Sequence, residues 1–153
     1  MNYWLFKTEP DAFGINDLIE RPQQTEHWDG VRNYQARNFL RNEIKLGDQV
    51  FLYHSSCDKV GIAGIAEVMK EGYVDHTQFD PDSKYYDPKS DPDKPRWYMV
   101  DIRFKRKFDH ILSLQEIKAN PALADMQLVQ KGNRLSVMPV TAGEWKILLA
   151  MAG

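Results

Sequence analysis

Short stretches in which apolar and polar residues alternate are the main structural signal in this chain, and such alternation predicts strands. Tyr3 to Thr8 alternates in this way and is followed by Glu9-Pro10, where the proline ends the strand because it has no N–H to donate. Four later stretches have the alternation or composition of strands: Asp48 to His54, Val60 to Met69, Arg96 to Phe108 and Arg134 to Val140. The pattern therefore predicts five strands.

Apolar residues three and four positions apart predict an amphipathic helix from Asn33 to Glu43. Its apolar side is formed by Ala36, Phe39, Leu40 and Ile44. Another side is basic, because three cationic residues follow one another at four-residue steps: Arg37, Arg41 and Lys45.

Hydrogen-bonding residues mark the start of three further helices. A short helix is expected between Asn16, as its N-cap, and Arg21-Pro22. Ser113 with Glu116, and Thr141 with Glu144, match the capping box, in which a hydroxyl and a carboxylate satisfy free amides of the first turn. Each of these two pairs predicts a helix start.

Residues 73–95 are rich in proline and aspartate, which predicts a long loop, although Phe79, Tyr85 and Tyr86 lie within it. Strands and short helices thus alternate irregularly, without the even rhythm of a parallel sheet. We predict an α+β fold: a small, mostly antiparallel β-barrel flanked by short helices.

Length, charge and cysteine content narrow the possible functions. The 153 residues suit one compact domain, so we expect residues 1–153 to form a single domain. The net charge of −2 excludes binding to nucleic acid through a general basic excess, and a nucleic-acid partner would need a local patch. The single cysteine, Cys57, excludes an internal disulfide and a thiolate-rich zinc site. The N-terminus has no pattern of a secretory signal and no apolar run suits a bilayer, so we expect a cytosolic protein without membrane contact.

The chain offers little catalytic chemistry. The only local arrangement of a nucleophile with a base is Cys57 close to His54, and this signal is weak because catalytic pairs usually come from distant segments. No nucleophile elbow, phosphate-binding loop or dinucleotide motif is present, and the four histidines lack metal-ligand spacing. We therefore expect no enzyme activity, cofactor or metal.

Aromatic and hydrogen-bonding residues are the alternative source of function. They make up a surplus of rings and polar groups of the kinds that stack on a flat heterocycle and bind its edge. The candidates are Trp28, Arg32, Asn33, Tyr34, Tyr53, His54, Ser55, Tyr85, Tyr86, Trp97 and Ser136. Core packing remains the competing explanation for the tryptophans, and a solvated face for Arg37, Arg41 and Lys45.

Six ordered blocks carry a family resemblance over nearly the whole chain. They are WLFKTEP from Trp4, WDGVRNYQARN from Trp28, GDQVFLYHS from Gly47, GIAGIAEV from Gly61, PRWYMVDIRF from Pro95 and LSVMPV from Leu135. In these blocks the chain resembles the EVE domain, a member of the PUA-like superfamily related to YTH and ASCH domains. Within the family, we expect the chain to resemble the small bacterial single-domain form.

The resemblance implies a compact β-barrel with helices and a pocket that holds a modified base, such as methylated or hydroxymethylated cytosine in DNA, or a modified base in RNA. It places Lys7, Thr8 and Glu9 at the pocket, Trp28 as a ring of its wall, and Trp97 or Tyr86 as the opposing ring. The remaining residues expected to border the base or contact its edge are Val31, Arg32, Asn33, Tyr34, Tyr53, His54, Ser55 and Ser136. Arg37, Arg41 and Lys45 are expected to contact phosphates.

Three hypotheses follow from these observations. The first is a non-enzymatic protein that recognises modified nucleobases in nucleic acid. The second is a protein that binds a small molecule or a free nucleoside, because a pocket in an acidic domain need not accept a polymer. The third, with the least support, is an enzyme that uses Cys57 and His54.

Overall fold

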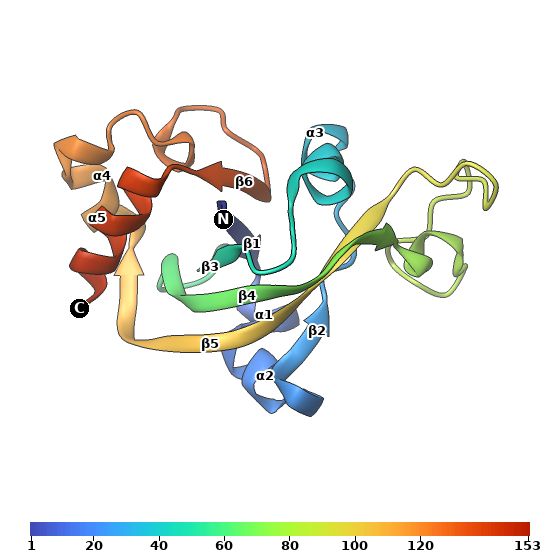
Figure 1. The fold of residues 1–153 in the computed structure, drawn as a ribbon, viewed down its shortest axis with the longest axis horizontal. Coiled ribbons are helices and arrows are strands. Elements are labelled where there is room, and N and C mark those ends of the chain that lie inside the picture. Colours follow the sequence, from blue (N-terminus) through green and yellow to red (C-terminus); the bar gives the residue numbers. More distant parts are fainter.

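The computed structural model describes residues 1–153 and is built on one mixed, six-stranded sheet with the strand order β2-β5-β4-β3-β1-β6 (Figure 1). The strands are β1 (Tyr3–Thr8), β2 (Thr25–His27), β3 (Gln49–His54), β4 (Gly61–Val74), β5 (Tyr98–Ser113) and β6 (Val137–Val140). β1 and β3 are parallel, and every other neighbouring pair is antiparallel. The expected α+β class with a mostly antiparallel sheet is confirmed.

The sheet is strongly curved but does not close into the expected complete barrel. β2 and β6 are its two edges and do not pair with each other. Curvature comes from the long strands β4 and β5, whose pairing shifts register between Ile62 and Gly64 and again between Ile65 and Ala66, as bulges do. β5 bends so that its last part lies beside the C-terminal helices (Figure 1).

The α-helices are α1 (Pro10–Phe13), α2 (Ile15–Glu20), α3 (Tyr34–Asn38), α4 (Leu114–Ala119) and α5 (Ala142–Ala152). Shorter or irregular turns are η1 (Pro22–Gln24), η2 (Phe39–Glu43), η3 (His76–Phe79), η4 (Pro121–Leu123) and η5 (Gln127–Val129). Both predicted capping boxes are present, since the Ser113 and Thr141 hydroxyls accept the amides of Glu116 and Glu144. α3 and η2 together form the predicted helix after Asn33, whose side chain accepts the Ala36 amide.

The N-terminal helix begins earlier than predicted, and Asn16 is not its N-cap. Gly14 is the N-cap of α2, and its N–H donates to the Asp17 carboxylate at 2.7 Å. Asn16 lies inside the helix, where its side-chain oxygen accepts from Lys107 instead. Asp17 in the first turn therefore stabilises the start of the helix, where the helix dipole favours a negative charge.

The strand ends also differ from the prediction. β4 continues to Val74, so the first residues of the predicted loop belong to a strand, and β5 continues to Ser113. β6 begins only at Val137, three residues later than predicted. The three-residue strand β2 is not among the five strands predicted from the sequence. β4 extends past the core, where pairing with β5 needs no alternation of apolar side chains, whereas the end of β5 pairs buried Leu112 with buried Ile62 beyond a register shift.

Two hydrophobic clusters lie on the two faces of the sheet. Trp4, Phe6, Val50 and Leu52 belong to the first cluster, together with Trp28, Leu18 and Leu40. Leu5, Phe51 and Tyr53, which alternate with them along β1 and β3, belong to the second, together with residues of α4 and α5. No helix combines the length and the apolar composition needed to span a bilayer.

Candidate functional site

A cavity of about 640 Å³ opens between the end of β1, α1, the segment from β2 to α3, and the segment before β6. This size lies within the range of ligand pockets. Eight of the predicted base-binding residues line it: Lys7, Thr8, Glu9, Trp28, Val31, Arg32, Ser55 and Ser136. The other lining residues are Ala12, Phe13, Arg21, Glu26, His27, Asp29, Gly30, Lys84, Tyr85, Arg134 and Leu135. Segments far apart in the sequence thus build one concave site.

Trp28 is both a core residue and part of the cavity wall. It is 7% exposed, and its ring lies 5.5 Å from that of Phe6 and 6.0 Å from that of Phe13, between ring centroids. Its backbone N–H donates to the Val100 carbonyl at 2.7 Å, which ties the turn after β2 to the sheet. The structure therefore removes the choice between core and cavity that the sequence left open, since Trp28 takes part in both.

Arg32 joins the turn after β2 to the long loop that follows β4. Its guanidinium donates to the Asp75 carboxylate at 3.0 Å, to the Thr77 hydroxyl at 3.1 Å and to the Tyr85 carbonyl at 2.8 Å. Because a guanidinium has a rigid fork of donors, these bonds fix both the position and the orientation of the loop. They hold Tyr85 at the cavity.

Asp75 is the fully buried partner in this network. Burial by itself would raise its pKa, but hydrogen bonds from Thr77, from the Gly30 N–H and from Arg32 outweigh burial and lower that pKa. Gly30 also allows Tyr85 to approach, because a Cβ at this position would lie 2.5 Å from the ring. The loop and the turn are thus fitted closely to each other.

Polar groups with unusual surroundings face the same cavity. The Lys7 ammonium lies 5.6 Å from the centre of the Tyr53 ring, and burial lowers the pKa of Lys7. Burial raises the pKa of Asp29, although His27, whose Nε2 lies 3.3 Å from its carboxylate, acts in the opposite direction. The cavity can therefore present both cationic donors and carboxylate acceptors to a ligand.

Six of the predicted base-binding residues lie outside this cavity. Asn33 uses its side chain to cap α3, and the ring of Tyr34 stacks on Trp97 at 4.9 Å. The indole N–H of Trp97 donates to Asp87 at 2.7 Å, which lowers the pKa of Asp87. The last three are Tyr53, which is buried in the second cluster, Tyr86, which is exposed, and His54.

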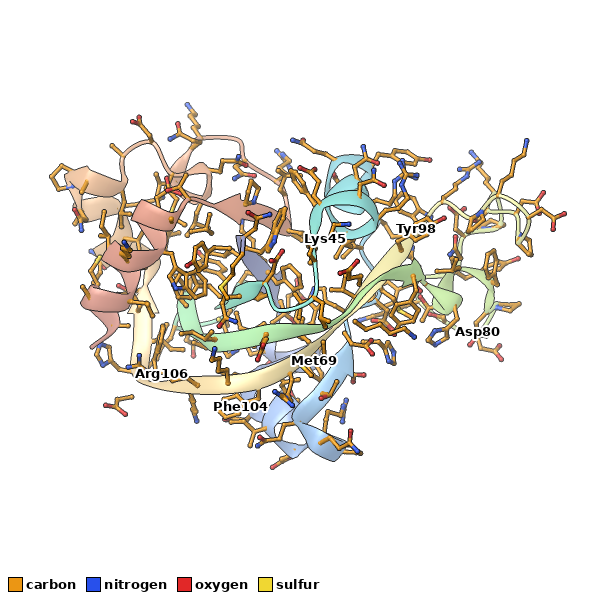
Figure 2. All side chains as sticks on the ribbon, viewed as in Figure 1. Lys45, Met69, Asp80, Tyr98, Phe104 and Arg106 are labelled. Carbon is orange, nitrogen blue, oxygen red and sulfur yellow. The ribbon has the colours of Figure 1, made fainter.

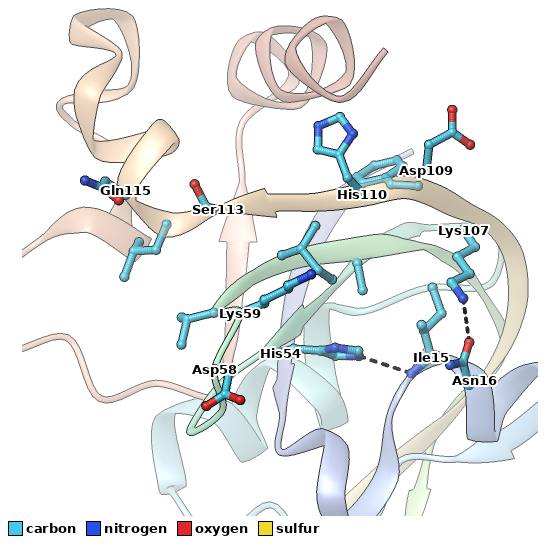
Figure 3. Close-up of a pocket in the computed structure, with 15 residues that line it drawn as sticks. Ile15, Asn16, His54, Asp58, Lys59, Lys107, Asp109, His110, Ser113 and Gln115 are labelled. Carbon is cyan, nitrogen blue, oxygen red and sulfur yellow. Dashed lines mark hydrogen bonds between the residues drawn. The ribbon is translucent and has the colours of Figure 1, made fainter.

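His54 faces a second cavity, of about 770 Å³, on the other side of the turn between α1 and α2 (Figure 3). Its Nε2 accepts the Ile15 amide at 3.1 Å, and burial lowers its pKa. The Cys57 thiol is directed to the Lys59 carbonyl at 3.5 Å, and no hydrogen bond joins Cys57 to His54. The contact expected of a nucleophile and its base is therefore not formed.

The predicted phosphate contacts lie on α3 and just beyond it, away from the cavity lining. Arg37 donates to the Arg96 carbonyl at 2.7 Å, and Arg41 donates to Asn42 at 3.1 Å. Lys45 lies 3.9 Å from the Glu71 carboxylate. Their role in binding phosphate stays a prediction.

The sequence pattern did not distinguish Tyr85 from Tyr86 as the ring of the cavity wall. Both residues are in the same loop, and Tyr85 is the one whose carbonyl is bound by Arg32 and whose ring lies against Gly30. Phe13 was also missed because it comes from a four-residue helix too short to show periodicity. For Lys84 and Arg134 the sequence holds no signal beyond their charge.

Comparison with known proteins identifies the family. The model of the EVE domain matches residues 2–151. Thymocyte nuclear protein 1 of Danio rerio is 47% identical, over 97% of this chain and 71% of the relative. A solved structure from Pseudomonas syringae is 50% identical with a TM-score of 0.94, covering 99% of both chains. Human THYN1 protein, solved in complex with 5-methylcytosine containing DNA, is 43% identical with a TM-score of 0.94, covering 99% of this chain and 98% of that one.

These relatives come from both bacteria and eukaryotes, so the expected likeness to the bacterial form in particular is not supported, and neither is a cytosolic location. The fold expected from the resemblance agrees with the solved structures. Because the family model and the relatives match nearly the whole chain, the chain belongs to the EVE domain family.

Proposed function

We propose that residues 1–153 act as a single EVE domain that binds DNA carrying a modified cytosine, and that the modified base enters the cavity between Trp28, Arg32 and Tyr85. The observation that carries this proposal is the likeness to human THYN1 protein, which was solved in complex with 5-methylcytosine containing DNA. Four of the six blocks of sequence that carry the family resemblance, those from Trp4, Trp28, Gly47 and Leu135, contribute residues to the cavity.

The energetics of base extraction favour a cavity of this kind. Moving a base out of a duplex costs a few kcal/mol. Stacking on one aromatic ring returns about 1 to 3 kcal/mol. Tyr85 is the ring that we expect to stack, because it lines the cavity without belonging to either hydrophobic cluster, whereas Trp28 is packed against Phe6 and Phe13. Hydrogen bonds at the base edge then decide whether binding is favourable.

The polar lining suits the edge of cytosine. Its exocyclic amino group is a donor, and Glu9 and Asp29 present carboxylate acceptors in the cavity. The ring nitrogen and the carbonyl of cytosine are acceptors, for which Lys7 and Ser136 supply donors. The lining can therefore satisfy the edge of cytosine, and the methyl group at its C5 would be recognised by apolar contact with the wall.

The proposal is tested by titrating the protein with short duplexes that differ only in one central 5-methylcytosine. We expect tighter binding to the methylated duplex than to the unmethylated one. A matched pair of single-stranded oligonucleotides should show the same preference, without the cost of extracting a base from a duplex. Equal affinities for methylated and unmethylated DNA in both forms would refute base recognition. Matched RNA oligonucleotides show whether the preference is confined to DNA.

Tyr85→Ala is the informative variant, and Tyr86→Ala is its matched control. The two residues are adjacent in the loop, but only Tyr85 lines the cavity. We expect Tyr85→Ala to weaken binding of the methylated oligonucleotide by about tenfold, as removal of a stacking ring does, and Tyr86→Ala to leave it unchanged. Trp28→Ala is less informative because loss of a buried ring also destabilises the fold.

The same titrations separate the competing hypotheses. A protein for free nucleosides would bind 5-methyldeoxycytidine as tightly as the oligonucleotide, whereas base recognition in DNA predicts a clear gain from the polymer. Alkylation of Cys57 should leave binding intact, because the thiol does not line this cavity. Loss of binding after alkylation would instead support a role for Cys57.

A further inference from the structure

A basic surface lies beside the cavity on α3, η2 and the start of β5. We call it the arginine face, and it consists of Arg37, Arg41 and Arg96 with the aromatic rings of Tyr34 and Tyr98. Tyr34 is 52% exposed. Tyr98 is the first residue of β5, and β5 packs against η2. Figure 2 labels Tyr98 and also Lys45, which follows η2 in the chain.

The three arginines of this face have no carboxylate partner. The ion pairs formed by arginine elsewhere in the protein involve Arg21, Arg32 and Arg103. Burial lowers the pKa of Arg37, and the charge of Arg41 lowers that pKa further. Glu43, the one acid in α3 and η2, pairs with neither of them. The three arginines of this face therefore form no ion pair, although the charge of Arg96 reaches the nearby Asp87 carboxylate.

The guanidinium groups are held in place by contacts that leave donors free. Arg37 lies 5.0 Å from the centre of the Tyr34 ring and donates from Nη1 to the Arg96 carbonyl and from Nε to Asn38. Arg41 lies 5.8 Å from the centre of the Tyr98 ring and donates only to the side chains of Asn42 and Asn38. A guanidinium has five N–H donors, so each retains some for an outside acceptor.

The arginine face adjoins the cavity through two residues. Arg32 lines the cavity and also lies 5.4 Å from the centre of the Trp97 ring. Trp97 in turn stacks on Tyr34 at 4.9 Å with an angle of 23° between the rings. A polymer that placed one residue in the cavity would therefore reach the arginine face with its neighbouring residues.

We propose that the arginine face binds the phosphodiester backbone of DNA next to the base held in the cavity, an inference that rests on the function proposed above. Phosphate is the acceptor that planar, unpaired guanidinium groups match best. Lys45 is not part of this contact, because Glu71 lies within ion-pair distance of it. Phe39 and Ala36 anchor the helix from beneath, so that the arginines are presented on a rigid element.

The test compares two variants with the same change in net charge. Arg37→Glu with Arg41→Glu reverses the arginine face, and Lys118→Glu with Lys131→Glu reverses two exposed lysines near the C-terminal helices. Binding to methylated and unmethylated duplexes is measured by fluorescence anisotropy at several NaCl concentrations, and binding of free 5-methyldeoxycytidine by calorimetry. Arg41→Gln serves as a milder variant, because its side chain is exposed and its loss does not endanger folding.

We expect the arginine double variant to weaken binding of both duplexes by more than about tenfold at low salt. The slope of log K against log salt should fall in magnitude by about two, one unit for each phosphate that the protein no longer neutralises. Binding of the free nucleoside should be unchanged, and Arg41→Gln should lower the slope by about one. The lysine control should behave as the wild type.

The inference is overturned if the arginine double variant retains the wild-type slope, or if the lysine control loses as much affinity. Its failure is distinguishable from failure of the proposed function. Absence of any preference for 5-methylcytosine would refute base recognition, while an arginine-dependent salt slope on unmethylated DNA would still support the arginine face. A slope independent of these arginines would overturn it whatever the base preference.

Discussion

His54 and Thr8, which face each other on the paired strands β3 and β1, fix the turn that carries Phe13 into the cavity. The Thr8 hydroxyl donates to the Phe13 carbonyl at 2.6 Å, and His54 accepts the Ile15 amide at 3.1 Å. Accepting through Nε2 requires a neutral imidazole with its proton on Nδ1. The position of a cavity residue therefore depends on one protonation state.

Lowering the pH should destabilise the protein through His54. Its pKa is lowered from 6.5, mainly by burial, so below that value the unfolded chain takes up a proton more readily than the folded protein. The contribution of the neutral imidazole is complete above the ordinary pKa and is lost as the pH falls towards the folded pKa. Urea unfolding between about pH 7 and about pH 5 should show a steeper loss of stability for the wild type than for His54→Gln.

The control for this pH dependence is His110→Gln, because His110 is exposed and lines the same second cavity without contacting the Ile15 amide. It should keep the steep wild-type dependence. Identical pH profiles for the wild type and His54→Gln would contradict the role assigned to the imidazole.

Gly30→Ala should disturb the cavity as well as the backbone. Gly30 has a φ of +81°, and a Cβ there would meet the Tyr85 ring. Gly132 has a φ of +80° but nothing within 4 Å of an added Cβ, so Gly132→Ala measures backbone strain alone. We expect Gly132→Ala to lower the free energy of unfolding by about 1 to 2 kcal/mol, and Gly30→Ala to lower it further and to weaken binding of the methylated duplex. If Gly30→Ala and Gly132→Ala had equal effects on the free energy of unfolding and on binding of the methylated duplex, Tyr85 would not be displaced by the added Cβ.

The long loop between β4 and β5 is an ordered element because of its contacts with the turn after β2. Its composition alone predicts only a loop. Two of its groups, the Asp75 carboxylate and the Tyr85 carbonyl, nevertheless accept hydrogen bonds from Arg32, which lies more than forty residues earlier in the chain. Gln78 adds a second buried connection, since its amide donates to the Trp97 carbonyl at 2.9 Å. Such contacts make the loop part of the site rather than a flexible cover.

Asp75→Ala should release this loop. Removing the buried carboxylate takes the ion-pair partner from Arg32 and the acceptor from the Gly30 amide, which should cost about 3 kcal/mol of unfolding free energy. Hydrogen exchange at the Gly30 and Thr77 amides should accelerate. Asp82→Ala, at an exposed position in the same loop, should change neither measurement.

Elements with local signals were predicted well, and those that depend on distant partners were not. The helices after Ser113 and Thr141 follow from capping boxes that are complete within four residues, and β1 from its own alternation and the following proline. β2 has three half-buried residues and exists only because β5 pairs with it. The predicted strand lengths failed for the same reason, since β4 and β5 are extended by pairing with each other, beyond the core at the end of β4 and beyond a register shift at the end of β5.

The candidate cavity follows the same rule. Residues adjoining predicted strands and the start of α3, such as Thr8, Ser55 and Arg32, were placed correctly near one another. Tyr85, Lys84 and Arg134 come from irregular segments whose paths are set by hydrogen bonds across the molecule. A sequence pattern indicates only regular elements through their periodicity, and these irregular segments have no periodicity.

At the scale of the whole molecule, the curved sheet connects the two hydrophobic clusters. β1 contributes Phe6 to one cluster and Leu5 to the other, and β3 contributes Leu52 and Phe51 in the same way. Neither face can lose its packing without freeing strands on which the other face depends. The domain should therefore unfold as one cooperative unit, as small domains usually do, although its cavity lies on one side only.

Leu148→Ala tests this coupling from the side opposite the cavity. Leu148 is fully buried in α5, in the second cluster, and its truncation should lower the free energy of unfolding by about 2 to 5 kcal/mol. Because both clusters share β1 and β3, a fluorine label on Trp28 in the first cluster and one on Trp145 in the second should report the same lowered urea midpoint. Binding of the methylated duplex to the folded variant should be unchanged, since α5 lines no part of the cavity. Separate midpoints for the two labels would mean that the sheet does not unite the two faces, and that the base-binding side can persist when the helical side has unfolded.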